Sequence, residues 1–309
     1  VEMSTLSKEN QRQVREAIKD SIQKAERERK NLQEKASKDA ESLWEKSKPA
    51  DPAHPYLIKK KVSPFDLRQN RRDGMDILLV PLIDLDGKIW SIQYIYPDGK
   101  KIFLKDGRSS GLMHNLGDPT PTRIIAEGFS TGASIHEATG HCVHIAFNCH
   151  NLKAVAESIR KAYPDTDLVI ASDDDWKTEG NPGLTKGADA ARSVKAKLAI
   201  PTWPEKQRGE KDTDFNDLAI SHGPAHITTC IGRAARPLEE KMPKEDRQTV
   251  LNRLSELDQI EYDLIRVAKA KKLGIRASTL DNEITKLRGQ KAAQETPFGT
   301  PIEPWPEPV

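Results

Sequence analysis

Between residues 122 and 200 the sequence alternates short apolar runs with helix-forming stretches, and this alternation limits the fold more than any other feature. The predicted strands are Arg123–Ala126, Val143–Phe147 and Asp167–Ala171, with a fourth beginning at Ile200. The predicted helices are Thr131–Ala138, Leu152–Ala162 and Leu184–Leu198. Repeated strand–helix units need a crossover after each strand, so the strands run parallel and the helices cover both faces of the sheet. We therefore predict an α/β domain over residues 121–222.

Residues 51–120, which precede this domain, have the pattern of a β-rich segment. Ile77–Ile83, Ile89–Ile95 and Lys101–Leu104 are apolar or mixed runs separated by Asp-Gly turns. Strands joined by such short turns predict an antiparallel meander. Between residues 59 and 108, eleven Lys or Arg stand against seven Asp, so positive charge is concentrated in this segment.

Helical segments flank these two parts. Residues 6–46 are highly charged, lack Gly and Pro, and carry apolar residues at helical spacing, which predicts one long amphipathic helix, or two, in an N-terminal arm over residues 1–50. Residues 223–290 are predicted to form a helical C-terminal domain with a helix-turn-helix pattern, and the pattern favours a connector or partner-docking role over DNA contact. Residues 291–309, rich in Pro and Thr, are predicted to be a disordered tail.

Composition excludes several classes of protein. The chain has 49 Lys plus Arg and 47 Asp plus Glu, so its net charge of +2 cannot bind nucleic acid by bulk attraction. No apolar run approaches the roughly 20 residues of a membrane span, so we expect no membrane contact. Three Cys without paired spacing indicate a reducing cytoplasm. The spacing of His141, Cys142 and His144 matches no common zinc site, so we expect a buried Cys142 and no zinc.

Acidic residues follow the predicted parallel strands. Glu127 comes after the first strand, Asp173–Asp175 after the third, and Asp212–Asp217 later in the chain. Ligands bind beyond the carboxyl ends of such strands, where these acids should converge. Clustered carboxylates repel one another and need a cation, and their oxygen atoms favour Mg²⁺ or Mn²⁺, which suit phosphoryl transfer. The alternative is that Asp173–Asp175 only caps a loop and is solvated.

The Glu127-Gly128 pair with Asp173-x-Asp175 resembles the Toprim domain of bacterial-type primases, topoisomerases and some nucleases. From about residue 40 to 222 the chain also resembles plasmid- and phage-encoded primases. Further motifs that carry this resemblance are His54-Pro55-Tyr56-Leu57, Val80–Asp84 with Asp86-Gly87, Asn181-Pro182-Gly183 and Asp214-Phe215-Asn216-Asp217. The resemblance implies a Rossmann-like Toprim sheet, with helices on both faces, behind a small β-rich basic subdomain.

The resemblance also implies roles for single residues. Glu127 would be the acid/base or metal-linked carboxylate, and Asp173 and Asp175 would hold Mg²⁺ or Mn²⁺. Asp214 and Asp217 match later acidic positions of the family and complete the candidate metal ligands.

The basic β segment would form a wall beside these acids that contacts template and nucleotide phosphates. The candidate nucleotide- and DNA-binding residues are Lys100, Lys101, Lys105, Arg108 and Lys186. The alternative is that the lysines and arginines of this segment only solvate its turns.

Together these features predict a DNA primase core, which makes short primers from ribonucleoside triphosphates on single-stranded DNA by Mg²⁺-dependent nucleotidyl transfer. Two alternatives stay open: a Toprim nuclease that uses the same metals, and a non-catalytic replication-accessory protein that binds DNA. The second stays open because no Cys precedes residue 142, so the zinc module of the family is not present in this sequence. A replicative helicase is the partner expected for the C-terminal helices.

Overall fold

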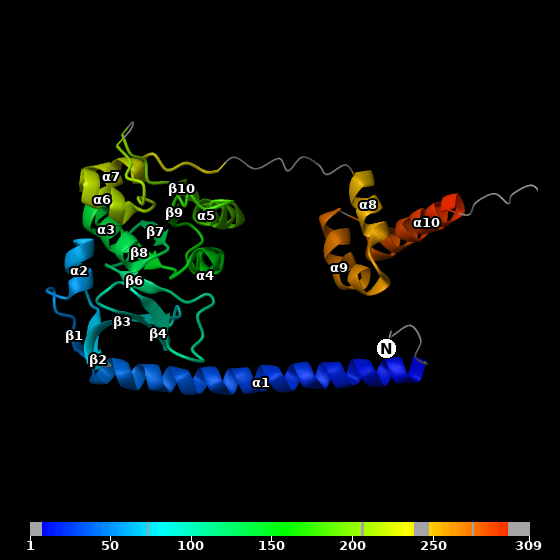
Figure 1. Cartoon of the computed structure of the whole chain (residues 1–309), viewed down its shortest axis with the longest axis horizontal. Coiled ribbons are helices and arrows are strands. Elements are labelled where there is room, and N and C mark those ends of the chain that lie inside the picture. The colour runs from blue at the N-terminus through cyan, green and yellow to red at the C-terminus, as the bar shows by residue number, and fades with distance from the viewer. Residues whose placement is uncertain (1–7, 73, 205–206, 238–246, 274, 296–309) are drawn as a thin grey trace, which may run out of the picture. The chain divides into compact units, whose positions relative to one another are not determined.

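The computed structural model describes residues 8–72, 74–204, 207–237, 247–273 and 275–295. By their contacts these residues divide into two compact units, with the boundary near residue 238. The first unit holds the helix α1 and two β-sheets, and the second holds three helices (Figure 1).

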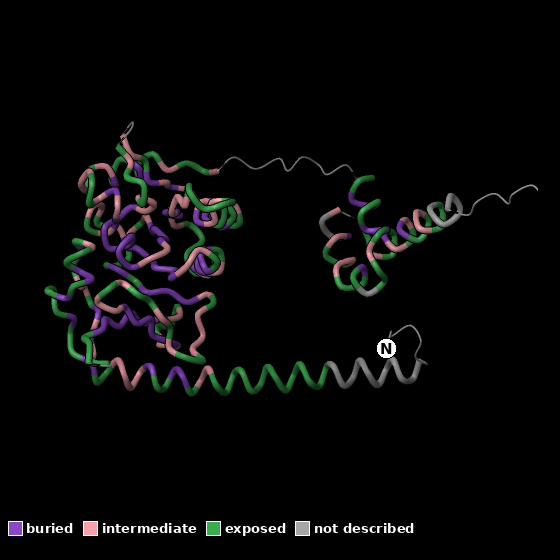
Figure 2. The backbone as a smooth tube through the Cα atoms, in the orientation of Figure 1, coloured by how far each residue is buried: buried purple, intermediate pink, exposed green. Residues whose placement is uncertain are grey.

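The N-terminal arm forms one long helix, α1 (Lys8–Lys46), and not two. Ala36 and Ala40 are buried near its C-terminal end, and Ala40 belongs to an apolar cluster of the first sheet that includes Ile77 and Ile92. Residues 19–32 are exposed along the middle of the helix (Figure 2). Over residues 19–46, the amphipathic pattern therefore reflects packing at the C-terminal end of α1.

The first sheet is the predicted antiparallel meander, extended by two strands. Its order is β1-β2-β3-β4-β5. The strands are β1 (Lys48–Pro49), β2 (Arg68–Arg72), β3 (Met75–Ile83), β4 (Ile89–Ile95) and β5 (Lys101–Phe103). A short helix, α2 (Pro55–Lys60), stands between β1 and β2. The three strands predicted from apolar runs are confirmed as β3, β4 and β5.

The second sheet has the predicted parallel arrangement, in the order β10-β9-β7-β8-β6. Its parallel strands are β7 (Thr122–Ala126), β8 (Cys142–Ile145), β9 (Asp167–Ala171) and β10 (Lys197–Ala199), and β6 (His114–Leu116) pairs antiparallel with β8. Neighbouring residues of β7 face different cores, because Ile124 and Ile125 belong to separate apolar clusters. Both faces of the sheet are therefore buried.

Helices cover the two faces of this sheet. The helices α4 (Leu152–Ala162) and α5 (Pro182–Val194) lie on one face, and α3 (Phe129–Thr139), α6 (Phe215–His222) and α7 (Pro224–Gly232) lie on the other (Figure 1). A single 3₁₀ turn, Cys149–Asn151, leads into α4. The predicted α/β class is confirmed.

The end of α5 and the fourth parallel strand lie earlier than the sequence predicts. Lys195 adopts a left-handed conformation, with φ at 55°, and its N–H bonds to carbonyl oxygens of the last turn, so the helix ends at Val194 and not at Leu198. Leu198 instead pairs with Ile170 of β9. The prediction that a strand begins at Ile200 is therefore wrong, because β10 has already ended at Ala199.

The helix α7 extends the first unit past residue 222. Ile227 and Ile231 belong to its apolar core, and Thr228 Oγ1 donates to the carbonyl oxygen of Ala138 on α3 at 3.0 Å. Contacts therefore carry this unit to about residue 238.

The second unit comprises α8 (Arg247–Glu256), α9 (Gln259–Lys272) and α10 (Ala277–Glu295), which confirms the helical prediction. The three helices share their own core, which includes Leu254, Leu280 and Ile284. The helix α10 continues to Glu295, into the predicted disordered tail, and the remainder of that tail lies outside the described residues. Among the residues described, no helix combines the length and apolar character needed to cross a membrane.

Candidate active site

The predicted acids meet at the carboxyl edge of the parallel sheet. Glu127 follows β7 and Asp173 follows β9, and these strands are neighbours with Ala126 opposite Ala171. Asp214 joins them as the N-cap of α6. The three carboxylates line a cavity of about 290 Å³.

The turn that carries Asp173–Asp175 is held by the start of α5. The Gly183 N–H donates to Asp175 Oδ2 at 2.9 Å, and Ser172 Oγ donates to the Gly183 carbonyl oxygen at 2.8 Å. A Cβ atom on Gly183 would lie 2.7 Å from the carbonyl oxygen of Asp173, so only glycine permits this close approach. The sequence Asn-Pro-Gly thus positions the acidic turn as well as starting a helix.

Asp173 lines the cavity, but Asp175 and the middle acid of this turn, Asp174, do not. The Asp174 carboxylate accepts hydrogen bonds from Asn181 Nδ2 at 2.6 Å and from Arg208 Nη1 at 2.6 Å. Asp174 is therefore an anchor of the turn.

The cavity disfavours three negative charges. Burial raises the pKa of Glu127, the charge of Asp175 raises it further, and Lys101 opposes the shift. Burial raises the pKa of Asp173 well above its usual value, with added repulsion from Asp214 and Glu127. The pKa of Asp214 is raised by burial and then by Asp217. A bound cation would relieve this accumulated repulsion.

The chemistry of these residues suits a divalent cation, although their present spacing does not form a complete metal site among the described residues. Asp173 Oδ1 is buried and accepts no hydrogen bond from the described residues, so it is a free oxygen ligand. Glu127, Asp175 and Asp214 add carboxylate oxygens, which Mg²⁺ and Mn²⁺ prefer. In the described ranges no three His, Cys, Asp or Glu side chains are already close enough to form a metal-binding group.

Asp217, a predicted metal ligand, is used differently from Asp214. Asp214 Oδ1 accepts from the Asp217 N–H at 2.8 Å, and Asp217 Oδ2 accepts from the Asp214 N–H at 3.4 Å, which together form a capping box on α6. Asp217 also lies 3.7 Å from Lys60 Nζ and does not line the cavity. Thr131 Oγ1 donates to Asp214 Oδ2 at 3.1 Å and fixes that carboxylate.

Of the predicted basic residues, Lys101 is the one that lines the cavity. Its Nζ lies 3.5 Å from the position that a Cβ on Gly128 would take, so a lysine of β5 reaches the loop after β7. Arg108 instead stacks on Trp90, with Cζ 4.8 Å from the ring centre, and Lys100 Nζ lies 5.9 Å from the ring of Tyr96. Lys105 and Lys186 are exposed and do not line the cavity.

Three residues of α2 also line the cavity: Tyr56, Lys59 and Lys60. The two lysines belong to the predicted basic segment but were not among its named binding residues, and Tyr56 was not predicted as a site residue. Tyr56 is only 2% exposed, and its hydroxyl has no hydrogen-bond partner within the described chain. The signal was available in the His54-Pro55-Tyr56-Leu57 motif, which starts this helix: Pro55 opens it, and His54 Nδ1 accepts from the Tyr56 N–H at 3.3 Å.

Cys142 is buried on β8, as expected. Its Sγ lies 3.9 Å from His144 Nε2, which in turn lies 3.4 Å from Arg123 Nη1. Burial, followed by the charge of Arg123, lowers the pKa of His144 to about 4. The positive charge of Arg123 beside His144 and Cys142 would repel a metal cation bound there.

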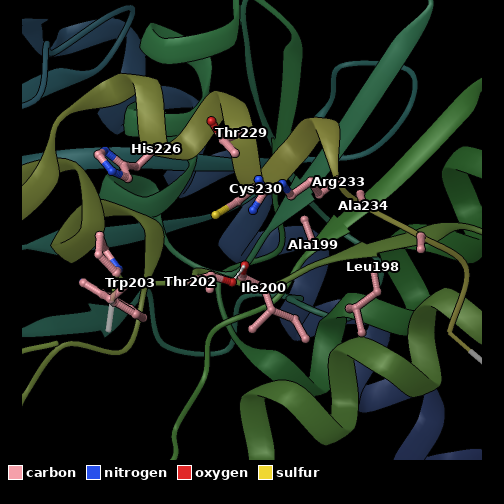
Figure 3. Close-up of a pocket in the computed structure, with 12 residues that line it drawn as sticks. Leu198, Ala199, Ile200, Thr202, Trp203, His226, Thr229, Cys230, Arg233 and Ala234 are labelled. Atoms are coloured by element: carbon pink, nitrogen blue, oxygen red, sulfur yellow. Dashed lines mark hydrogen bonds between the residues drawn. The ribbon is translucent and has the colours of Figure 1, made fainter. Parts of the chain in front are cut away.

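A larger cavity of about 530 Å³ lies beside β10 and α7 (Figure 3). Trp203, His226, Cys230 and Arg233 are among its lining residues. None of the predicted site residues is among the described residues that line it, and those described residues include no carboxylate.

Comparison with known proteins gives these sites a family context. Residues 122–225 match the family model described as Toprim domain. Two Escherichia coli proteins named DNA primase TraC are each 36% identical to this chain, one over 187 residues and the other over 164. The matches cover 58% and 50% of this chain but only 17% and 11% of those relatives, so the similarity concerns a small part of each.

Solved structures are also similar at low sequence identity. The DnaG primase catalytic domain bound to ssDNA matches with a TM-score of 0.48 and 13% identity, over 81% of this chain and 99% of that one. The Aquifex aeolicus primase, with zinc-binding and RNA polymerase domains, matches with a TM-score of 0.46 and 12% identity, over 82% of this chain and 75% of that one. Residues 122–225 are therefore a Toprim domain, and the chain is homologous over 58% of its length to a small part of DNA primase TraC.

Proposed function

We propose that this chain is the core of a DNA primase, which makes short RNA primers from ribonucleoside triphosphates on single-stranded DNA. One observation carries the proposal: Lys101 of the antiparallel sheet lines the same cavity as Glu127 and Asp173 of the parallel sheet. Nucleotidyl transfer needs carboxylates to hold a metal and cations to contact phosphates, and this cavity offers both. Homology to part of DNA primase TraC supports the same activity.

In the proposed reaction the primer 3′-oxygen bonds to the α-phosphorus of the incoming nucleotide, and the bond from that phosphorus to pyrophosphate breaks. Glu127 would accept the proton of the 3′-hydroxyl, because its raised pKa makes it a stronger base than an exposed carboxylate. Asp173 and Asp175, with Asp214 beside them, would hold Mg²⁺ or Mn²⁺. When bound, the ion polarises the α-phosphate and neutralises charge on the leaving group.

The basic residues would divide between inner and outer contacts. Lys101, with Lys59 and Lys60, would contact the triphosphate, because these side chains line the cavity. The exposed candidates would meet the template strand farther out, where attraction to phosphates depends on salt. They are Lys100, Lys105 and Lys186, and the half-buried Arg108 would join them. We also propose that the second unit docks a replicative helicase.

The test is incubation of the full chain with single-stranded DNA, labelled ribonucleotides and Mg²⁺. We expect short labelled products, which Asp173→Asn should abolish. Asp189→Asn is the matched control, because Asp189 is an exposed acid of α5 that pairs only locally with Arg192, at 3.2 Å. Degradation of the DNA would favour the nuclease, and binding without synthesis would favour the accessory protein.

A further inference from the structure

An exposed tryptophan directly follows the acidic turn. Trp176 is 47% exposed, although burying an indole is strongly favourable. Its Cα is one peptide unit, about 3.8 Å, from that of Asp175. An exposed aromatic face is the kind of surface on which a nucleobase can stack.

The position of Trp176 is fixed by a second loop. The Cζ atom of Arg208 lies 5.0 Å from the centre of the Trp176 ring and 4.4 Å from that of Trp203. Arg208 is itself held by Asp174 at 2.6 Å and by the carbonyl oxygen of Asp212, to which Nε donates at 2.9 Å. The indole therefore has a defined orientation although it is exposed, and a preorganised surface loses little entropy when a ligand binds.

Two cationic side chains flank the ring of Trp176. Arg208 lies over it, and Lys177 Nζ lies 5.0 Å from its centre. Each cation is paired with a carboxylate, Arg208 with Asp174 and Lys177 with Glu210 at 3.7 Å, so the aromatic face rather than excess charge would carry the contact. An aromatic face flanked by cations is the usual means by which proteins bind single-stranded nucleic acid without reading its sequence.

We propose that Trp176, supported by Arg208, is a stacking platform for a nucleobase next to the acidic site. This inference rests on the proposed function, which brings a single strand and a nucleotide to the acids at this edge of the sheet. The ligand is a base of the DNA strand or of the incoming nucleotide, since the two share the same aromatic face. Stacking at Trp176 would hold that base while its phosphates lie toward the cavity.

The experiment measures binding of a fluorescein-labelled oligo-dT to the full chain in Mg²⁺ by anisotropy, with a gel to check that the DNA stays intact. Trp176→Ala should weaken binding by about 5- to 150-fold, the range for loss of one base–aromatic stack. The salt dependence of binding should not change, because no phosphate contact is lost. Trp176→Phe should restore most of the affinity, since it keeps an aromatic face.

Tyr163→Ala is the matched control. Tyr163 is also an exposed aromatic residue with a guanidinium over its ring, that of Arg123 at 3.9 Å, but it follows α4, before the strand that leads to Asp173. This variant should bind oligo-dT like the wild type. A second arm measures a fluorescent ATP analogue, and weakening confined to that arm would assign the base to the incoming nucleotide. Wild-type affinity of Trp176→Ala in both arms would overturn the platform.

Two further readouts separate this inference from folding and from the proposed function. The first compares quenching of tryptophan fluorescence in the wild type and in Trp176→Phe, a mild substitution. Oligo-dT or ATP should quench the wild type more, and equal quenching of the two proteins by both ligands would overturn the platform. Primer synthesis is measured separately. If the wild type binds through Trp176 but makes no primer, the primase is refuted and the platform stands. If the wild type makes primer but Trp176→Ala binds normally in both arms, the platform is refuted and the primase stands.

Discussion

Arg208 and Asp174 form an ion pair, with Nη1 of Arg208 2.6 Å from Oδ2 of Asp174, at the centre of the turn that carries the candidate metal ligands. Arg208 Nη2 also donates to the carbonyl oxygen of Asp174 at 2.8 Å. Both side chains are mostly buried, with 23% and 17% exposed. The pair therefore ties the loop before α6 to the turn after β9 and fixes where Asp173 and Asp175 lie.

Removal of this pair should weaken metal binding although it removes no ligand. We expect Arg208→Ala to lower Mg²⁺ or Mn²⁺ affinity by about 10- to 100-fold, the scale for groups that orient metal ligands. Titration calorimetry measures the affinity. The matched control is Lys197→Ala, which breaks the exposed Lys197–Asp167 pair at 3.0 Å and should bind the ion normally. Equal affinities would mean that Arg208 ties the loops together without orienting the acids.

Replacement of Glu127 by Gln should separate its chemical role from its structural one. The amide keeps the shape and removes the charge, so the fold should survive while primer synthesis falls by a hundredfold or more, roughly the scale of lost acid/base catalysis. Glu137→Gln is a useful control, because Glu137 accepts from the Ser63 N–H at 2.9 Å, away from the cavity. A collapse of the melting temperature in Glu127→Gln would make the residue structural.

The acid cluster should make stability depend on pH in a specific direction. Burial, followed by repulsion between carboxylates, raises the pKa of Asp173 and Glu127. Each group then binds more protons folded than unfolded, so its contribution destabilises the metal-free protein as pH rises from about 4 through the raised pKa. Below that range the folded and unfolded carboxyls are both protonated and the penalty disappears.

Asp173→Asn tests this directly in EDTA. The variant lacks the unfavourable charge, so it should melt above the wild type at about pH 8, by roughly 2–4 °C for each kcal/mol relieved. The difference should shrink at about pH 5, and saturating Mg²⁺ should stabilise the wild type more than the variant. A wild type that is the more stable of the two in EDTA at the higher pH would contradict the predicted repulsion.

The parallel domain could be predicted because each strand is an apolar run followed by a helix pattern, and local sequence suffices for that. The strand β2 was missed because Arg68–Arg72 has the sequence Arg-Gln-Asn-Arg-Arg and gives no apolar signal. It forms through its partner, with Arg68 opposite Leu79 of β3. Pairing of this kind is a tertiary effect that a local pattern does not contain.

The sequence predicts that these acids gather at one site, but it does not predict the separate role of each side chain. Asp214 and Asp217 look alike in sequence, yet the capping box on α6 leaves Asp214 at the cavity and turns Asp217 toward Lys60. Asp174 was passed over between two predicted ligands, and its role depends on Arg208, which lies far along the chain. Side-chain tasks of this kind depend on contacts between distant loops.

The lysines of the antiparallel sheet should differ in effect. Lys101→Ala should weaken nucleotide binding, because its Nζ reaches the Glu127-Gly128 loop, whereas the exposed Lys105→Ala should leave nucleotide affinity unchanged. On single-stranded DNA, each lost phosphate contact should flatten the salt dependence by about 0.7 units of slope. Binding measured across a salt series gives both quantities. Identical nucleotide affinities and salt slopes of the two variants would mean that Lys101 makes no special contact with the nucleotide in the cavity.

The two compact units should separate at residue 238, not at residue 222. A fragment that ends at residue 238 keeps α7, whose Ile227 and Ile231 are buried in the first core, so it should fold and bind Mg²⁺ like the full chain. A fragment that ends at residue 222 loses these side chains and exposes the face of α3 that they cover. Loss of two large buried aliphatic residues costs several kcal/mol, so the shorter fragment should melt well below the longer one.

Thermal denaturation of both fragments, with limited proteolysis of the full chain, checks this division. Proteolysis should leave a stable product that retains α7 and the acidic site. The longer fragment should still make some primer while losing any contact that the helices α8–α10 provide. Equal melting temperatures for the two fragments would show that α7 adds nothing to the first unit, and an unfolded longer fragment would show that the two units depend on each other.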